Sequence, residues 1–454
     1  MWHMIPSLDA AVQALAPAFT HPSFCTHCQL VLGWLMCPGT HTLYRVSQTI
    51  HADEEISAAQ RHPFDRFYNF FSRSGWTVSG LAHRVAVFAV TRLQVRGPLY
   101  LIVDDTLIHK RGQHVWGLGW FRDAVASTRK RVATASGNNW VVLGLAVPIP
   151  GCPGRVLCLP LLARLHLPGK NQPSCTALAG AMLQEVHAWF PDRSLILVGD
   201  GAYTCQTVLA ALPPTGVAFV GRMRGDAAVF DPRPARVAAG RRGPKPKKGA
   251  RLLSPKAAAA TADRQRNGRG PWQWQPVSVT VYGQARTLRA LSYPVVWPSV
   301  AGLRPVQVVV VRDPEGTMDD AYLVTTEVNA TAAWVIEAFA QRWSVEGLFR
   351  SSKQVLEIEA PQQWCPQSVE KLAPWVWLMQ TVITIWYLSE GRALPAAQAA
   401  RATMGSWDSE WSLRHMLKVV RRATFDTTIN NLFAAETDLQ QIIQTLKNCV
   451  NLAA

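Results

Sequence analysis

Short apolar runs bounded by glycine, proline and polar residues dominate the chain from residue 96 to residue 224. Runs of this length and composition are typical of buried β-strands. Apolar residues instead recur at helical spacing over residues 174–190, and a shorter helical pattern follows at 204–212. The pattern therefore predicts an α/β domain with three strands before the first of these helices. The five predicted strands are 99–103, 140–147, 155–162, 194–198 and 217–221.

The regions on either side of this domain have helical patterns. Residues 1–95 predict a compact helical domain, in which residues 40–49 are compatible with part of a helix-turn-helix. A helical cap on the α/β domain is the alternative interpretation. Residues 329–395 predict a second part of the α/β domain, and residues 396–454 predict a helical C-terminal region.

Residues 225–328 are far longer than a connection between two elements needs. No acid occurs between Asp231 and Asp263, and proline and glycine disfavour a helix there, so we expect a flexible basic loop. The remainder predicts a β-rich insertion with strands at 277–282, 287–292, 306–312 and 322–327. The densest cluster of basic residues in the loop is Arg241, Arg242, Lys245, Lys247 and Lys248.

Composition and charge narrow the range of partners. The 454 residues allow about three domains, and 48% of them are hydrophobic, as in a globular protein. The net charge of +16 favours a polyanion such as DNA, RNA or an anionic membrane. A membrane is the least supported, because we find no signal peptide or lipid anchor and the longest apolar stretch, 375–388, is too short to span one. The nine scattered cysteines predict reduced thiols and a cytoplasmic location.

Acidic residues follow two of the predicted strands. Asp104 and Asp105 follow the run 99–103, and Asp200 follows the run 194–198. The carboxyl ends of neighbouring strands meet at one edge of an open α/β sheet, where ligands bind. One strand followed by an acid is weak evidence, since such an acid often only caps a turn. Because side chains alternate along a strand, only one of Asp104 and Asp105 can face a shared site.

A third acid, Glu346, lies in a predicted helix together with Phe339, Arg342 and Lys353. In a regular α-helix these four residues fall within a stripe of roughly 60°. A carboxylate, a guanidinium and an ammonium on one stripe can hold a metal ion beside a phosphate. A solvated helix face with an i,i+4 Arg–Glu pair is the alternative. Gly347 is unfavourable in mid-helix, which predicts a close approach of DNA or another backbone.

In combination, Asp104, Asp200 and Glu346 resemble the acidic triad of the DDE transposases. The helix resembles the Tyr-Arg-Glu-Lys signature of bacterial insertion-sequence transposases, with the same two, three and six intervening residues. Phe339 stands where that signature has Tyr, so the hydrogen bond of a phenol to a phosphate is lost. The resemblance implies a ribonuclease H-like mixed sheet with a β-rich insertion, flanked by helical regions at both ends.

The resemblance also implies metal-dependent chemistry at a phosphodiester. Asp104, Asp200 and Glu346 would be both the catalytic residues and the ligands of two Mg²⁺ or Mn²⁺ ions. In the family the first acid stands two residues before Thr or Ser, which favours Asp104, with Thr106, over the alternative Asp105. The residues implied to bind DNA are Phe339, Arg342, Arg350, Lys353, Arg241, Arg242, Lys245, Lys247 and Lys248.

The function that the resemblance implies is cut-and-paste transposition. The protein would cleave double-stranded DNA at the ends of an insertion sequence, gripping them with residues 1–95, and join the ends to target DNA. We expect a homodimer, because two ends must be held together, working near the bacterial nucleoid. A structure-selective nuclease and a domesticated DNA-binding regulator on the same fold are the alternatives.

Overall fold

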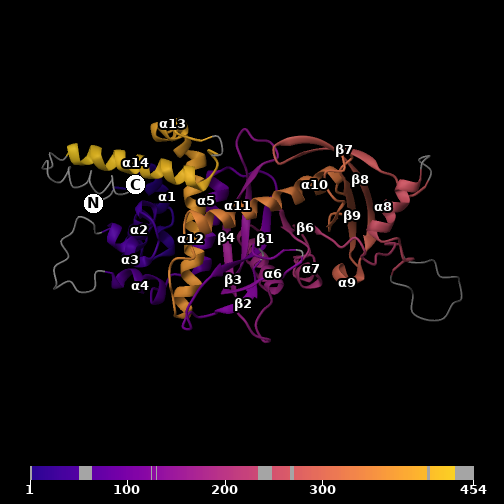
Figure 1. Cartoon of the computed structure of the whole chain (residues 1–454), viewed down its shortest axis with the longest axis horizontal. Coiled ribbons are helices and arrows are strands. Elements are labelled where there is room, and N and C mark those ends of the chain that lie inside the picture. The colour runs from indigo at the N-terminus through magenta and orange to yellow at the C-terminus, as the bar shows by residue number, and fades with distance from the viewer. Residues whose placement is uncertain are drawn as a thin grey trace.

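A large mixed β-sheet lies at the centre of the protein and helices pack around it (Figure 1). The computed structural model describes residues 3–50, 64–123, 125–128, 130–233, 248–265, 270–405 and 409–434. The strand order is β2-β3-β1-β5-β6-β10-β9-β8-β7, with β4 paired to β3. The strands are β1 (Leu99–His109), β2 (Gly119–Arg122), β3 (Thr134–Pro148), β4 (Val156–His166), β5 (Leu195–Gly199), β6 (Val217–Arg222), β7 (Gln275–Val281), β8 (Gln284–Val296), β9 (Pro305–Arg312) and β10 (Ala321–Thr325).

The five strands predicted for the α/β domain are present, and the structure adds the short strand β2. Strand β1 pairs with β3 in antiparallel fashion and with β5 in parallel fashion, and β6 continues the parallel part. The predicted strands of the insertion are also confirmed. They do not form a separate sheet, because β10 pairs with β6 and thereby joins β9, β8 and β7 to the central sheet.

Most of the helices lie at the two ends of the chain, as the pattern predicted. Side-chain caps begin three of the internal helices: the side-chain oxygens of Ser174, Ser254 and Thr331 accept from the backbone N–H groups of Ala177, Ala257 and Trp334. The α-helices are α1 (Pro6–Gln13), α2 (His21–Met36), α3 (Leu43–Ile50), α4 (Asp65–Ser72), α5 (Val78–Arg92), α6 (Cys175–Trp189), α7 (Gln206–Ala210), α8 (Pro255–Arg264), α9 (Pro298–Ala301), α10 (Ala332–Ala340), α11 (Ser344–Gln354), α12 (Pro366–Ser389), α13 (Pro395–Ala402) and α14 (Leu413–Ala434). The 3-10 turns are η1 (Ala16–Ala18), η2 (Gln341–Trp343) and η3 (Gly391–Ala393).

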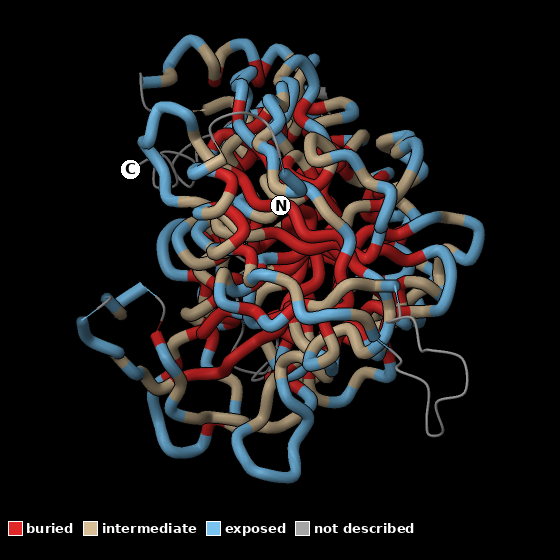
Figure 2. Tube along the Cα trace, turned by 90° about the vertical axis from the view of Figure 1, so that its right-hand side faces the viewer, coloured by how far each residue is buried: buried red, intermediate tan, exposed pale blue. Residues whose placement is uncertain are grey.

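Helix α12 joins the N-terminal helices to the sheet. It is apolar on all sides and almost completely buried, as expected of a helix that other elements surround. Helices α1, α4 and α5 pack against one part of it and β4 against another. The described N-terminal helices and the sheet therefore share one core. Figure 2 shows buried residues in the interior of the protein and exposed residues around them. Among the described helices, none is long and apolar enough to cross a membrane.

One of the two histidines of α2, His27, is part of this shared core. His27 is fully buried, and its Nδ1 accepts a hydrogen bond from the indole Nε1 of Trp375 at 3.0 Å. Burial lowers the pKa of His27 from 6.5 to about 3. A further proton would have to bind at Nδ1, so protonation would break the bond to Trp375.

We predict that this histidine makes the fold acid-sensitive. Its folded pKa lies below its unfolded pKa, so the unfolded state takes up the proton first as the pH falls through 6.5 toward 3. Relative to a His27→Gln variant, the wild type should lose about 2 kcal/mol of unfolding free energy between pH 7.5 and pH 5. Denaturant unfolding at the two pH values measures this difference. His83→Gln, at an exposed histidine on α5, is the control for replacing a histidine by glutamine as such.

Candidate active site

The pairing of β1 with β5 brings the first two predicted acids together. In the parallel register Val103 lies beside Gly199, so the next residues along the two chains, Asp104 and Asp200, are level with each other. Strand β5 ends at Gly199, whereas β1 continues to His109 along its other partner β3. Asp104 therefore lies within a strand but at the point where its pairing with β5 ends.

The carboxylate of Asp200 is oriented by the turn that follows it. The backbone N–H groups of Ala202 and Tyr203 donate to its Oδ1 at 2.8 and 3.3 Å. The hydroxyl of Thr204 donates to the backbone carbonyl of Asp200 at 3.0 Å. This is the local turn in which an aspartate commonly takes part. It leaves Oδ2 of Asp200 without a bond from this turn.

Asp104 and Asp105 point to opposite faces of the sheet, as strand alternation requires. Asp104 accepts a hydrogen bond from Arg342 in the turn η2. Asp105 accepts from the phenol of Tyr203 and from Asn139 on β3, on the face where α6 begins. Of the two candidates, the structure thus brings Asp104 to the face on which Glu346 lies.

Arg342 connects the first strand to the helix that carries Glu346. Its Nη1 lies 3.1 Å from Oδ2 of Asp104, and its Nη2 lies 3.3 Å from Oε1 of Glu346. The ring of Trp343 lies 5.4 Å from the guanidinium carbon. The side chain of Arg342 is only 16% exposed and that of Asp104 only 19%. Arg342 therefore supplies a partly buried positive charge between two of the three predicted acids.

The electrostatics of Asp104 show that the acids are crowded. Burial, and after it the neighbouring charge of Asp200, raise the pKa of Asp104 from 3.8 to about 7. The guanidinium of Arg342 acts in the opposite direction. A carboxyl with such a pKa is stabilised in its charged form by any cation that reaches it. Perturbation of this kind, at a sheet edge, is typical of a functional site.

The predicted stripe of four residues on one regular helix is wrong in its geometry. Helix α10 ends at Ala340, the 3-10 turn η2 follows, and α11 begins at Ser344. A 3-10 turn has 3.0 residues per turn instead of 3.6, so it changes the direction of the side chains beyond it. Phe339, on α10, packs against the hydrophobic core. The turn also places Arg342 between the acids instead of along a continuous face.

Lys353, at the end of α11, binds the backbone of β1. Its Nζ donates to the carbonyl of Leu107 at 2.6 Å and lies 3.9 Å from Oε1 of Glu359. Burial lowers the pKa of this lysine. Arg350 is exposed and lines a separate cavity of about 390 Å³ between α11, β4 and α14. Lys353 thus contacts β1, whereas Arg350, one turn earlier on α11, lines this cavity.

A second group of contacts fastens the segment after α11 to β1, and sequence reasoning missed it. Lys110 is buried, and its Nζ donates to the carbonyls of Glu359 and Pro361 at 2.8 and 2.7 Å. His109 lies between Glu359 and Asp123, with ring nitrogen to carboxylate distances of 3.0 and 2.9 Å. The only sequence signal was a His–Lys pair directly after a strand, which is too common to be specific.

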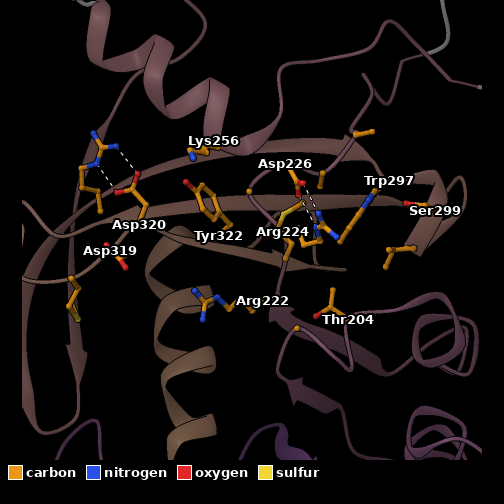
Figure 3. A pocket seen from close by; sticks show the side chains of 18 of the residues that line it. Thr204, Arg222, Arg224, Asp226, Lys256, Trp297, Ser299, Asp319, Asp320 and Tyr322 are labelled. Carbon is orange, nitrogen blue, oxygen red and sulfur yellow. Dashed lines mark hydrogen bonds and ion pairs between the residues drawn. The ribbon is translucent and has the colours of Figure 1, made fainter. Parts of the chain in front are cut away.

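A cavity of about 1400 Å³ opens beside the turn after Asp200, between β6, β10 and the insertion (Figure 3). Its lining includes four basic and four acidic residues. Arg224 pairs with Asp226 at 2.6 Å and Arg312 with Asp320 at 2.7 Å. Figure 3 shows Arg224–Asp226 and Asp320 toward opposite ends of the cavity, with Tyr322 between them. The formal charges of the lining therefore sum to zero.

The donor set at the sheet edge fits a hard divalent cation in its chemistry. Asp104, Asp200 and Glu346 offer only carboxylate oxygens, which Mg²⁺ and Mn²⁺ prefer. Like charges meet at Asp104, and a cation would relieve their repulsion. Among the residues that the structure describes, however, no three His, Cys, Asp or Glu side chains lie close enough to hold a metal ion. Arg342, not a third carboxylate, occupies the space between Asp104 and Glu346.

The predicted basic loop is described only at its end. Lys248 is exposed, and its Nζ lies 3.8 Å from the ring centre of Phe230. The other four residues of the basic cluster, Arg241, Arg242, Lys245 and Lys247, lie outside the described residues. All eight described cysteines are free thiols, as predicted.

Comparisons with known proteins identify a family for this chain. A family model described as "DDE superfamily endonuclease" matches residues 14–287, which is 274 of the 454 residues. The match includes Asp104 and Asp200 and ends before Glu346. The chain is similar to a piggyBac transposase solved by cryo-electron microscopy as a synaptic complex with hairpin DNA, at 12% identity and a TM-score of 0.40, covering 99% of this chain and 81% of that one. No curated protein sequence matches the chain.

A substitution at Gly347 tests whether DNA comes close to α11. A Cβ atom added there would meet no atom within 4 Å, and the position lines the 390 Å³ cavity. We predict that Gly347→Ala raises the free energy of unfolding by about 0.5–1 kcal/mol, because alanine favours the helix. If DNA approaches this position closely, the same variant binds DNA more weakly. Denaturant unfolding and a DNA-binding titration measure the two effects.

Gly33 in α2 is the matched control for this substitution. A Cβ atom there would lie 2.6 Å from Cγ1 of Ile50 and 2.9 Å from the carbonyl oxygen of Val46. Gly33→Ala should therefore destabilise the protein although alanine is the better helix former. A loss of stability in Gly347→Ala would contradict the open space that the structure shows at this position.

Proposed function

Because the chain belongs to the DDE superfamily endonuclease family, we propose that it is a DNA transposase. It cleaves DNA at the ends of a mobile element and joins the freed 3′ ends to target DNA. The observation that carries the proposal is the meeting of Asp104 and Asp200 at one sheet edge, with Glu346 connected to them through Arg342. The strand order from β3 through β1 and β5 to β6, with α6 before β5, supports a ribonuclease H-like catalytic domain.

The three acids have distinct tasks in this proposal. Endonucleases of this family use divalent metal ions. Asp104 and Asp200 would share the ions, and Glu346 would complete the ligand set. When bound, two Mg²⁺ or Mn²⁺ ions activate the attacking water or 3′-hydroxyl and stabilise the leaving oxygen. The protein's own contribution is to hold its carboxylates in place before the DNA arrives, since positioning and charge neutralisation supply most of the catalysis of phosphoryl transfer.

Arg342 neutralises Asp104 and Glu346 while neither cation nor DNA is present. A guanidinium binds phosphate as well as carboxylate in the same two-pronged manner. We propose that its guanidinium would bind a phosphate beside the scissile bond when DNA is present, while Asp104 and Glu346 would be free to hold a cation. Lys353 is the second residue that binds a phosphate in the proposal. For that role it has to leave the carbonyl of Leu107, to which it donates in the free protein.

The remaining parts of the proposal concern partners. Double-stranded DNA is the substrate, residues 1–95 bind the element ends, and two copies of the chain hold the two ends together. A structure-selective nuclease with the same acids would cleave DNA without joining it. A DNA-binding regulator would do neither. Products in which the element end is joined to a new DNA molecule therefore separate the first function from the other two.

We predict that Asp104→Asn, Asp200→Asn and Glu346→Gln each abolish cleavage and leave DNA binding intact. The assay uses a plasmid carrying the DNA that flanks the gene, with Mg²⁺ or Mn²⁺, and detects nicked, cut and joined products. Asp104→Asn should also be at least as stable as the wild type, because asparagine removes a charge that burial and the neighbouring Asp200 both disfavour. Loss of activity then cannot be attributed to unfolding.

Asp319→Asn is the matched control for these substitutions. Asp319 is exposed and lines the electroneutral cavity, away from Arg342 and Glu346. Its replacement should leave cleavage unchanged. Wild-type cleavage by Asp104→Asn or Glu346→Gln would exclude the proposed acids, and cleavage without any joined product would favour the structure-selective nuclease.

We further predict that the basic loop provides salt-sensitive, sequence-independent affinity for DNA. Replacing the cluster Arg241, Arg242, Lys245, Lys247 and Lys248 with glutamine should weaken binding equally for related and unrelated DNA sequences. The slope of log affinity against log salt should become shallower by about 0.9 for each phosphate that the loop no longer neutralises. Binding titrations between low and moderate salt measure the slope. An unchanged slope would show that the loop does not bind phosphates.

A further inference from the structure

A chain of three hydrogen bonds connects the carboxylate of Asp104 to that of Asp200. The backbone N–H of Asp105 donates to Oδ1 of Asp104 at 2.9 Å. The phenol of Tyr203 donates to Oδ1 of Asp105 at 3.1 Å. The backbone N–H of Tyr203 then donates to Oδ1 of Asp200 at 3.3 Å. The bonds therefore begin at one proposed catalytic carboxylate and end at the other.

Tyr203 is a rigid member of this connection. It is only 1% exposed, and burial followed by the charge of Asp105 raises the pKa of its phenol, so the hydroxyl keeps its proton. Its place depends on Gly199 at the end of β5. A Cβ atom on that glycine would lie 2.9 Å from Cβ of Tyr203, closer than such atoms approach in folded proteins.

The second carboxylate oxygen of Asp105, Oδ2, also accepts a hydrogen bond. Nδ2 of Asn139, on the neighbouring strand β3, lies 3.4 Å from Oδ2 of Asp105. Both oxygens thus have donors on the face opposite to Arg342. Since Asp105 and Asp104 are consecutive, fixing the side chain of Asp105 also fixes the strand segment from which Asp104 projects.

We propose that Asp105 and Tyr203 are positioning residues that set the separation and orientation of Asp104 and Asp200. The inference rests on the proposed nuclease site. Strand pairing makes Asp104 and Asp200 level, but their side chains repel each other, so a support is needed to keep the two carboxylates at a fixed separation and orientation. Bonds from outside the ligand set are the usual means of orienting metal-binding carboxylates, and their loss costs roughly 10- to 100-fold in ion affinity or activity.

The first measurement is Mn²⁺ binding to the full chain without DNA, followed by the electron paramagnetic resonance signal of free Mn²⁺. Tyr203→Phe removes only the hydroxyl and keeps the ring in its place. We expect it to bind Mn²⁺ about 10-fold more weakly than the wild type, with unchanged DNA affinity and a thermal unfolding midpoint close to the wild-type value. Tyr293→Phe is the matched control, because the buried hydroxyl of Tyr293 has no hydrogen-bond partner among the described residues.

The second measurement is the rate of plasmid cleavage as a function of Mn²⁺ concentration. Tyr203→Phe should need about 10-fold more Mn²⁺ for half-maximal cleavage and should regain most of its rate at saturation. Asp105→Asn keeps an oxygen that accepts from Tyr203, so it should retain most cleavage, whereas Asp105→Ala should behave like Tyr203→Phe. A structural role alone would lower the unfolding midpoint and DNA binding and leave the Mn²⁺ dependence of the folded protein unchanged.

The outcomes distinguish the positioning role of Asp105 and Tyr203 from the proposed nuclease site. If the wild type binds Mn²⁺ and cleaves DNA, and Tyr203→Phe shows the same Mn²⁺ dependence, the positioning role is overturned and the nuclease site stands. If Asp105→Asn abolishes cleavage as Asp104→Asn does, Asp105 is itself a ligand and the positioning role is again overturned. If the wild type neither binds Mn²⁺ nor cleaves DNA, the proposed function and the positioning role are both overturned.

Discussion

The parallel pairing of β1 with β5 is the interaction on which the site depends. Two strands far apart in the sequence are brought into one register, and this register makes Asp104 level with Asp200. The hydrophobic residues of both strands are mostly buried, so a slip by one residue would turn an apolar face toward solvent. The packing of the core therefore enforces the meeting of two acids that repel each other.

In the free protein, the positively charged side chain of Arg342 offsets part of this repulsion. Arg342 reaches both Asp104 and Glu346, and it can do so because the chain passes through a 3-10 turn between α10 and α11. A guanidinium in this place keeps the partly buried acids from being left unpaired, which is costly in a protein interior. Any ion or phosphate that binds here has to exchange with an interaction already present. In this protein stability and ligand binding compete for the same charges.

Helix α11, which carries Glu346, packs against the sheet and is fastened to β1 at a distance from the acids. Lys353 donates to Leu107, and buried Lys110 donates to the segment after α11. Glu359 serves the same purpose by accepting from His109. These contacts lie along the second half of β1, beyond its pairing with β5. One long strand thus carries the first acid at its middle and the attachment of the third acid's helix at its end.

The sequence by itself determined the elements and the acids. Apolar runs predicted the strands, since burying a strand requires such a run, and the acids after 99–103 and 194–198 were visible directly. Strand alternation also showed that Asp104 and Asp105 face opposite sides. Which side faces Glu346 was decided only by the tertiary structure, because it depends on where α11 packs against the sheet. The same packing turned Lys353 toward β1 and joined the insertion strands to the central sheet. Local patterns determine what each segment can form, whereas contacts between distant segments decide which side chains meet.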